Sequence, residues 1–237
     1  KRQLLVAPVT LREGMEKLIH NEITNARNGK KSLIKAKMNS LVDPDLINLL
    51  YEASQAGVKI KLIVRGMCCL YPGKEGLSEN IQVISIIGRY LEHSRIFWFY
   101  NNNDPQVFLG SADWMRRNLD RRVEAVTPIE DEVLKKQLEN ILEVYLEDNV
   151  DAWEMKSNGE FIQKISKKEK RCAQVALMNL ISADITANQP KLLHNTQWYQ
   201  STTVYNQQSI ATNNKAQYFM FGGSDAKMNS LVDSQWK

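Results

Sequence analysis

The sequence has few of the residues that form cross-links or hold structural metals. Three cysteines and three histidines occur in 237 residues, and neither type has the spacing of a zinc site. Cys68 and Cys69 are adjacent, vicinal cysteines rarely pair with each other, and Cys172 makes the count odd. We therefore expect reduced thiols in a cytosolic protein.

Long apolar runs are also absent. No stretch of about 18 or more apolar residues occurs, which excludes a membrane-spanning helix. The start of the chain lacks the apolar core of a signal peptide, and because residue 1 is Lys rather than Met we expect a piece of a longer protein. The formal net charge of +4 is too small to dictate a partner, so local charge clusters matter more.

Composition and length are those of a globular protein. Hydrophobic residues make up 43% of the chain and charged residues 24%. A chain of 237 residues can form one domain of roughly 150 to 180 residues with an appendage, or two small domains. From residue 182 onward Asn, Gln, Thr and Ser dominate. Residues 36–43 recur letter for letter as 226–233 without matching flanks, and we assign no role to this repeat.

Apolar periodicity and turn residues predict alternating strands and helices. Thr10 and Glu13 are expected to form a capping box, and Asp43 to cap a helix that has Pro44 in its first position. The expected strands cover residues 3–9, 32–38, 59–64, 81–87, 95–100, 107–109 and 120–126, with a hairpin of 153–155 and 161–165; the expected helices cover 11–28, 45–56, 114–119, 129–147 and 164–181.

Residues 32–64 have the order strand, helix, strand. This order predicts a βαβ unit with two parallel strands and a right-handed crossover. Ligands gather at the carboxyl ends of such strands. Lys37 and Asn39 lie at the end of the first strand and Arg65 at the end of the second. A single cation at a strand end is usually just solvated, but two beside a histidine favour a binding site.

The histidine is His93, which directly precedes a β-prone run. Arg95 follows two residues later and should lie on the same face. A turn over residues 101–105 would make the next strand adjacent and bring Ser111 and Asp113 beside His93. Arg121 and Arg122 are expected to lead into a strand, so at least one guanidinium should point to the same edge, where it needs an anion. The helix 129–147 should pack on the core through one apolar face that includes Leu134, Leu138, Ile141, Leu142 and Tyr145.

Several separated motifs, in this order, resemble one family. They are Lys37-Met-Asn-Ser-Leu-Val-Asp43, Leu62-Ile-Val-Arg-Gly66, Leu91-Glu-His-Ser-Arg-Ile-Phe97, Gly110-Ser-Ala-Asp-Trp-Met115 and Asn118-Leu-Asp-Arg-Arg-Val-Glu124. Together they resemble the last catalytic domain of bacterial polyphosphate kinase, the long multidomain type whose catalytic half is built like phospholipase D. The resemblance covers about residues 1–170.

The resemblance implies an α/β fold with a phospholipase-D-like mixed sheet flanked by helices and a C-terminal extension. Residues 1–170 would be the catalytic domain, and 171–237 a helix and polar tail. It implies reversible transfer of the terminal phosphate of ATP to polyphosphate, with magnesium held outside this fragment. The phosphorylated histidine would lie in a preceding domain. His93 would then be an acid or base, and Arg65 and Arg122 would bind nucleotide phosphates.

The implied partners are ATP or ADP, polyphosphate and the upstream domain of the same polypeptide. The full-length protein is expected to be a cytoplasmic homo-oligomer that binds no nucleic acid and associates with membranes at most peripherally. The isolated chain should have almost no kinase activity. Two alternatives stay open: a phospholipase-D-like phosphodiesterase or nuclease acting as a dimer, against which Arg95 in place of Lys counts, and a non-catalytic polyanion-binding module.

Overall fold

The computed structural model describes residues 4–165 and 169–182. A single mixed sheet forms the centre of the larger of two compact units, Lys1–Ile87 with His93–Ala173. The strands are β1 (Leu5–Ala7), β2 (Leu33–Met38), β3 (Lys59–Val64), β4 (Ile81–Ile86), β5 (Ile96–Phe99), β6 (Gln106–Gly110), β7 (Glu124–Ile129), β8 (Ala152–Met155) and β9 (Phe161–Gln163). The helices are α1 (Leu11–Arg27), α2 (Pro44–Gln55), α3 (Arg116–Asp120) and α4 (Glu132–Leu146), with a 3-10 turn η1 (Asn101–Asn103).

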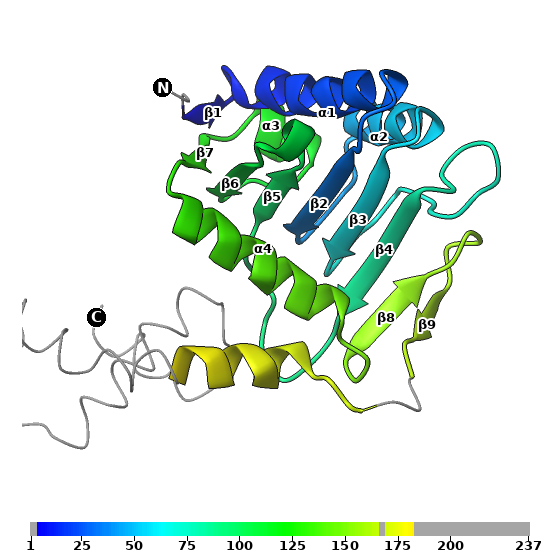
Figure 1. Ribbon diagram of the computed structural model, residues 1–237, viewed down its shortest axis with the longest axis vertical. Coiled ribbons are helices and arrows are strands. Elements are labelled where there is room, and N and C mark those ends of the chain that lie inside the picture. Colours follow the sequence, from blue (N-terminus) through cyan, green and yellow to red (C-terminus); the bar gives the residue numbers. More distant parts are fainter. Residues whose placement is uncertain (1–3, 166–168, 183–237) are drawn as a thin grey trace, which may run out of the picture. The chain divides into compact units, whose positions relative to one another are not determined.

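The strand order is β1-β7-β6-β5-β2-β3-β4-β8-β9. Strands β2 and β3 are parallel, as the βαβ pattern predicted. Strand β4 is also parallel to β3, and the remaining pairs are antiparallel. The expected mixed sheet flanked by helices is therefore confirmed (Figure 1). Among the described residues, no helix is both long and apolar enough to cross a membrane.

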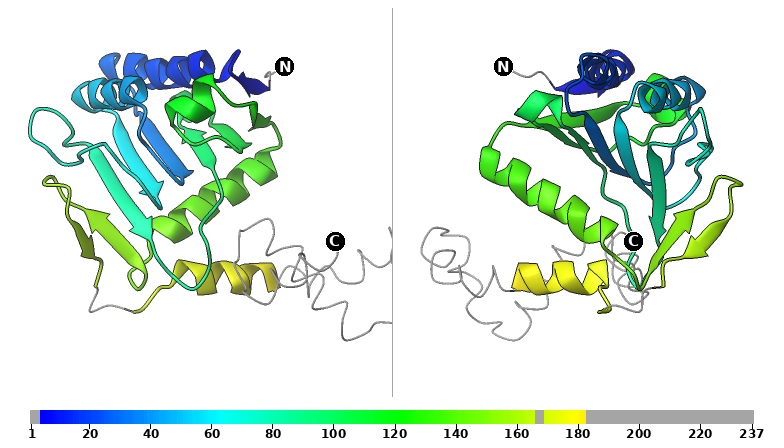
Figure 2. Two further views of the ribbon diagram at one scale, coloured as in Figure 1. Left: turned by 180° about the vertical axis from the view of Figure 1, so that it is seen from behind. Right: turned by 45° about the vertical axis from the view of Figure 1, so that its right-hand side comes forward.

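Helices cover both faces of the sheet, with α1 and α2 on one side and α4 on the other (Figure 2). Alternation along β2 shows why. Ile34, Ala36 and Met38 are at most 1% exposed and join the main apolar core with residues of α1 and α2. Lys35 and Lys37 point the other way, toward α4. Period-two alternation thus assigns one face to the apolar core and the other to lysines.

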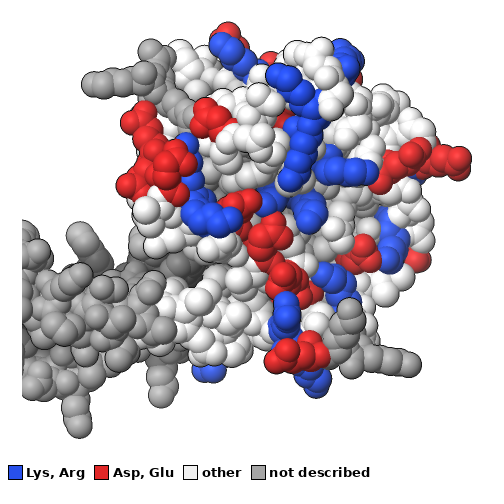
Figure 3. Space-filling model, viewed as in Figure 1, with Lys and Arg blue, Asp and Glu red and all other residues white. Residues whose placement is uncertain are grey.

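The lysine face is a mixed surface. Lys35 forms ion pairs with Glu139 at 3.0 Å and Glu143 at 2.6 Å, both on α4, and lies over the ring of Trp98. Seen from the side shown in Figure 1, Lys and Arg side chains lie over β2 and β3, and Asp and Glu side chains lie beside them along α4 (Figure 3). Carboxylates therefore offset much of the positive charge on this face.

The segment after β2 is held by a buried ion pair. Asp43 is fully buried and caps α2 by accepting from the N–H of Leu46 at 3.0 Å, as predicted. Arg12 of α1 donates to both carboxylate oxygens of Asp43, at 3.0 and 2.7 Å, and also binds Asp120. Trp114 adds backbone support, because its carbonyl accepts from the N–H groups of Val42 and Asp43.

The predicted capping box of α1 is wrong. Thr10 makes no side-chain cap, because its hydroxyl turns back to accept from the N–H of Val6 at 3.0 Å. Two other expectations also fail. Strand β7 begins at Glu124 rather than residue 120, and Leu134 on α4 is 48% exposed rather than packed. The helix expected over residues 164–181 covers only residues 173–182 in the structure. Of the expected earlier part, residues 164–165 and 169–172 are described, and they are not helical.

The second unit contains residues 88–92 and 174–182 among those described. The side chain of Gln174 accepts from the N–H of Tyr90 at 3.0 Å and donates to the Tyr90 carbonyl and to Glu92, each at 2.8 Å. The predicted polar tail from residue 183, with the repeat at 226–233, lies outside the described residues.

Candidate functional site

Polar side chains from four strands meet at one end of the sheet. Lys37 and Asn39 lie at the end of β2, and Arg65 follows the parallel strand β3. Because β5 is antiparallel to β2, with Ile96 opposite Lys37, the start of β5 brings His93 to the same end. Asp113, shortly after β6, completes the group. We call these five residues the rim.

His93 is exposed and touches Asn39, whose Nδ2 lies 3.4 Å from Nδ1 of the imidazole. Burial of part of the ring lowers the pKa of His93 below its ordinary value, and the charges of Arg95, Arg65 and Lys37 lower it too, while Asp113 opposes them. The structure thus places two of the predicted cations beside the histidine from different strands, together with Arg95. His93 is mostly neutral near pH 7 as a result.

Arg95 and Asp113 bind each other. Nε and Nη2 of Arg95 donate to the two carboxylate oxygens at 3.2 and 3.1 Å, and Nη1 donates to the backbone carbonyl of His93 at 2.8 Å. Asp113 also accepts from the N–H of Asn39 at 2.7 Å. These contacts hold Arg95 and Asp113 to each other and to the backbone of His93 and Asn39. Direct phosphate contact by either residue stays a prediction.

Arg65 has a donor with no protein partner. Its Nη1 is buried, yet finds no hydrogen-bond acceptor among the described residues. The backbone of Arg65 is fixed, since its carbonyl accepts from the hydroxyl of Ser85 at 3.0 Å. The next residue is Gly66, where a larger residue would not fit, because a Cβ would lie 2.9 Å from the carbonyl oxygen of Asn39. A buried guanidinium nitrogen without an acceptor is costly unless an anion completes it.

Lys37 is almost completely buried, at 1% exposed, between β2 and α4. Its Nζ lies 3.5 Å from the carbonyl oxygen of Ser94 and 4.8 Å from the ring centre of Tyr145. The sequence placed Lys37 at the strand end but gave no sign of the aromatic contact, because Tyr145 lies more than a hundred positions away.

Three other predicted site residues follow β6 and α3 in the chain. The hydroxyl of Ser111 is hydrogen-bonded to Glu124, which also accepts from Nδ2 of Asn118 at 2.6 Å. Arg121 and Arg122 lie in the exposed turn between α3 and β7, and Arg121 acts electrostatically on Asp120. The strand expected from residue 120 begins only at Glu124, so both arginines precede it rather than lie within it. A role in phosphate binding stays a prediction for both.

The rim does not fit a magnesium ion. Mg²⁺ needs carboxylate oxygens that are available for coordination, and both oxygens of Asp113 accept hydrogen bonds from Arg95. One other cluster, Asp148, Asp151 and Cys172, has ligand atoms within 4.8 Å of one another. Asp148 is already satisfied there by four backbone N–H groups. Cys68, Cys69 and Cys172 form no disulfide, and the thiol of Cys172 donates to Asp151 at 3.1 Å.

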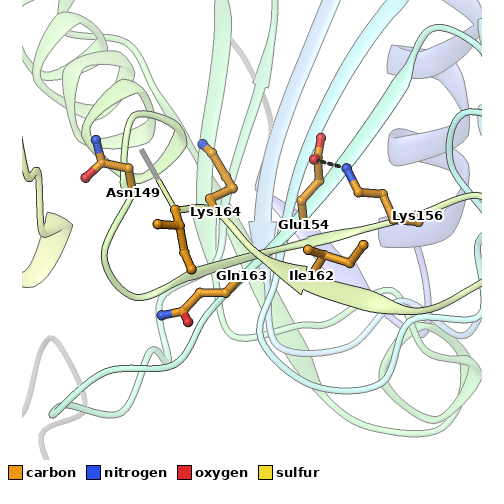
Figure 4. Close-up of a pocket in the computed structure, with 7 residues that line it drawn as sticks. Asn149, Glu154, Lys156, Ile162, Gln163 and Lys164 are labelled. Atoms are coloured by element: carbon orange, nitrogen blue, oxygen red, sulfur yellow. Dashed lines mark hydrogen bonds and ion pairs between the residues drawn. The ribbon is translucent and has the colours of Figure 1, made fainter. Parts of the chain in front are cut away.

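A cavity of about 310 Å³ lies beside the β8–β9 hairpin (Figure 4), and none of the five rim residues lines it. Its polar groups are used internally. Lys156 pairs with Glu154, Lys164 donates to the carbonyl of Leu146 at 2.8 Å, and Gln163 donates to the carbonyl of Val150 at 2.9 Å. The rim therefore remains the better candidate for a ligand site.

Comparison with known proteins agrees with the motifs. The family model "Polyphosphate kinase C-terminal domain 2" matches residues 4–174. A polyphosphate kinase of Prochlorococcus marinus (strain MIT 9313) is 62% identical over 188 residues, which is 78% of this chain and 26% of that protein. One from Pseudomonas aeruginosa is 47% identical over 187 residues, covering 78% of this chain and 27% of that protein.

A solved structure agrees as well. The crystal structure of polyphosphate kinase from Porphyromonas gingivalis is 41% identical, with a TM-score of 0.76 over 78% of this chain and 29% of the other. This chain therefore spans about a quarter of the length of such relatives. The family match covers all five rim residues. The chain belongs to the polyphosphate kinase C-terminal domain 2 family.

Proposed function

We propose that this chain supplies part of the phosphoryl-transfer site of a polyphosphate kinase, which moves the terminal phosphate of ATP reversibly onto polyphosphate. The observation that carries the proposal is the buried Nη1 of Arg65, which has no acceptor among the described residues, at a rim shared with His93 and Lys37. Phosphate oxygens are the acceptors that such a guanidinium fits.

The rim suits phosphoryl transfer because it is already ordered. In such reactions negative charge spreads over the equatorial oxygens of the transferred group, and fixed cations stabilise that charge. The main chain of Arg65 is held by Ser85, and Lys37 is held under α4. Both residues are therefore already anchored at the rim. The imidazole of His93 supplies a polar hydrogen for a phosphate oxygen.

The remaining parts of the activity are proposed from the family. The phosphorylated histidine would come from an upstream domain of the same polypeptide. Magnesium would be bound by that domain or by the substrate phosphates, because the rim offers it no available carboxylate. We also propose ATP binding by Arg122, a cytoplasmic homo-oligomer for the full-length protein, and low activity for this chain alone.

The test uses the full-length enzyme with His93→Ala and Arg65→Ala. We expect His93→Ala to abolish polyphosphate synthesis, and Arg65→Ala to raise KM for ATP at least tenfold, with the melting temperature little changed in both. Arg27→Ala is the matched control, because Arg27 is an exposed arginine that only pairs with Glu52 on the surface. Its kinetics should equal those of the wild type.

Two results would contradict the proposal. Turnover of His93→Ala close to that of the wild type would show that this chain contributes no catalytic group through His93. The chain would then act only as a module that binds polyanions by its charge. Equal KM values for Arg65→Ala and Arg27→Ala would show that the buried guanidinium does not meet the nucleotide.

A further inference from the structure

Asn39 contacts both Asp113 and His93. Its backbone N–H donates to Oδ1 of Asp113 at 2.7 Å, and its Nδ2 lies 3.4 Å from Nδ1 of His93. The residue is only 4% exposed, so little water competes for these contacts. Because an amide nitrogen can only donate a hydrogen bond, Nδ1 of His93 is the acceptor in this pair.

A closed circuit of hydrogen bonds holds this pair together. Arg95 grips the carboxylate of Asp113 with two nitrogens and donates a third hydrogen bond, of 2.8 Å, to the carbonyl of His93. The main chain of His93 is thus tied, through Arg95, to the same carboxylate that holds the main chain of Asn39. Asp113 is the common anchor, and its own exposure is only 6%.

We propose that Asn39 is a positioning residue that keeps Nδ1 of His93 unprotonated, so that Nε2 presents its N–H to the phosphate oxygens. This inference rests on the proposed function. Asp113 and Arg95 contribute by holding Asn39 and His93 in register, without touching the phosphate. In histidines generally, the hydrogen bond made by one ring nitrogen determines which nitrogen carries the proton.

The arrangement makes His93 an uncharged donor. A second proton would have to sit on Nδ1, where it would face the amide N–H of Asn39. The positive charges of Arg95, Arg65 and Lys37 also oppose that proton, and Asp113 alone favours it. Replacing the amide of Asn39 with a carboxylate should reverse the preference, because an Asp side chain accepts from Nδ1–H.

The experiment is a pH titration of the 237-residue chain by ¹⁵N NMR, with labelled histidine and the His93 signals assigned by their loss in His93→Ala. In the wild type we expect Nδ1 unprotonated and Nε2 protonated at pH 7.5. Asn39→Asp should move the proton to Nδ1 and raise the midpoint of the titration by about one unit or more. A melting curve checks that the variant is folded.

Asn102→Asp is the matched control. It adds the same charge in η1, beyond the opposite end of β5, where Asn102 is exposed. It should leave both the tautomer and the midpoint of His93 as in the wild type. A wild-type spectrum with the proton on Nδ1, or an equal response to Asn39→Asp and Asn102→Asp, would overturn the positioning role.

A kinetic measurement tests the positioning role of Asn39 separately from the proposed function. In the full-length enzyme Asn39→Asp should lower kcat at least tenfold, with a smaller change in KM for ATP, and should move the pH profile of kcat toward alkaline pH. A pH profile identical to that of the wild type would refute the inference. Normal synthesis by His93→Ala would instead refute the proposed function, whatever the NMR spectra show.

Discussion

Removal of the Asp43 charge should destabilise the sheet end that carries the rim. Asp43 is fully buried, caps α2 and receives two hydrogen bonds from Arg12. Loss of a helix cap costs about 1 kcal/mol, and loss of one member of a buried ion pair costs about 3 to 5 kcal/mol. The Arg12 side chain is 23% exposed and keeps Asp120, so the lower part of that range applies.

Two substitutions divide this cost between cap and charge. Asp43→Asn keeps an oxygen that can accept from the N–H of Leu46, so it should lose about 3 kcal/mol of the free energy of unfolding, from the charge alone. Asp43→Ala loses the cap as well and should be about 1 kcal/mol worse. Urea unfolding of the 237-residue chain, followed by tryptophan fluorescence, measures both at constant m-value.

Asp45→Asn is the control for this pair. Asp45 lies 3.6 Å from the same guanidinium, but its side chain is 61% exposed. Water screens such a pair, so the loss should be under about 0.5 kcal/mol. If Asp43→Asn were no more destabilising than Asp45→Asn, the ion pair would not hold the segment after β2.

The pH dependence gives an independent check on Asp43. Burial alone would raise the pKa of Asp43, but the hydrogen bonds from Arg12 and Leu46 hold that pKa below its ordinary value. A carboxyl with a lowered folded-state pKa stabilises the fold above its unfolded pKa, and this stability is lost as the pH falls through the folded pKa. The difference between the wild type and Asp43→Asn should therefore shrink below about pH 4.

Two further predictions concern Glu22 and Gly110. Burial raises the pKa of Glu22, which accepts from the N–H groups of Asn101 and Leu33. The contribution of Glu22 to stability should therefore fall as the pH rises through that pKa. Glu22→Ala should cost about 2 kcal/mol in thermal unfolding, and a loss below about 0.5 kcal/mol would contradict this. Gly110→Ala should lower the melting temperature markedly, because the added Cβ would lie 2.5 Å from Cγ2 of Val126 and 2.8 Å from a backbone oxygen; an unchanged melting curve would refute the close approach.

Local patterns predicted the elements whose cause is local. Asp43-Pro44 marked the start of α2, Gly57 marked its end, and the strand, helix, strand order fixed the parallel pair β2 and β3. The helix start at Thr10 failed for a tertiary reason, because the Thr10 hydroxyl binds back to Val6 in the turn before α1. The start of β7 failed because Glu124, a residue of low strand propensity, is held by Ser111 and Asn118.

The site was partly predictable for the same reason. Lys37, Asn39 and Arg65 could be placed at one edge, because parallel strands end together. The antiparallel pairing of β5 with β2, which brings His93 to that edge, came from the fold. Their roles could not be divided, because the sequence does not show which cation finds a protein acceptor. Arg95 has one in Asp113, whereas Nη1 of Arg65 has none among the described residues.

By itself the sequence determined the family, the βαβ unit and the strand ends that carry the polar residues, since motifs and periodicity act over short stretches of chain. Only the tertiary structure decided that Arg12 pairs with Asp43, that Arg95 and Asp113 anchor Asn39 and His93, and that Nη1 of Arg65 is buried without an acceptor among the described residues. Those outcomes depend on contacts between residues far apart in the chain, and a hydrogen bond forms only where the fold brings donor and acceptor within about 3 Å.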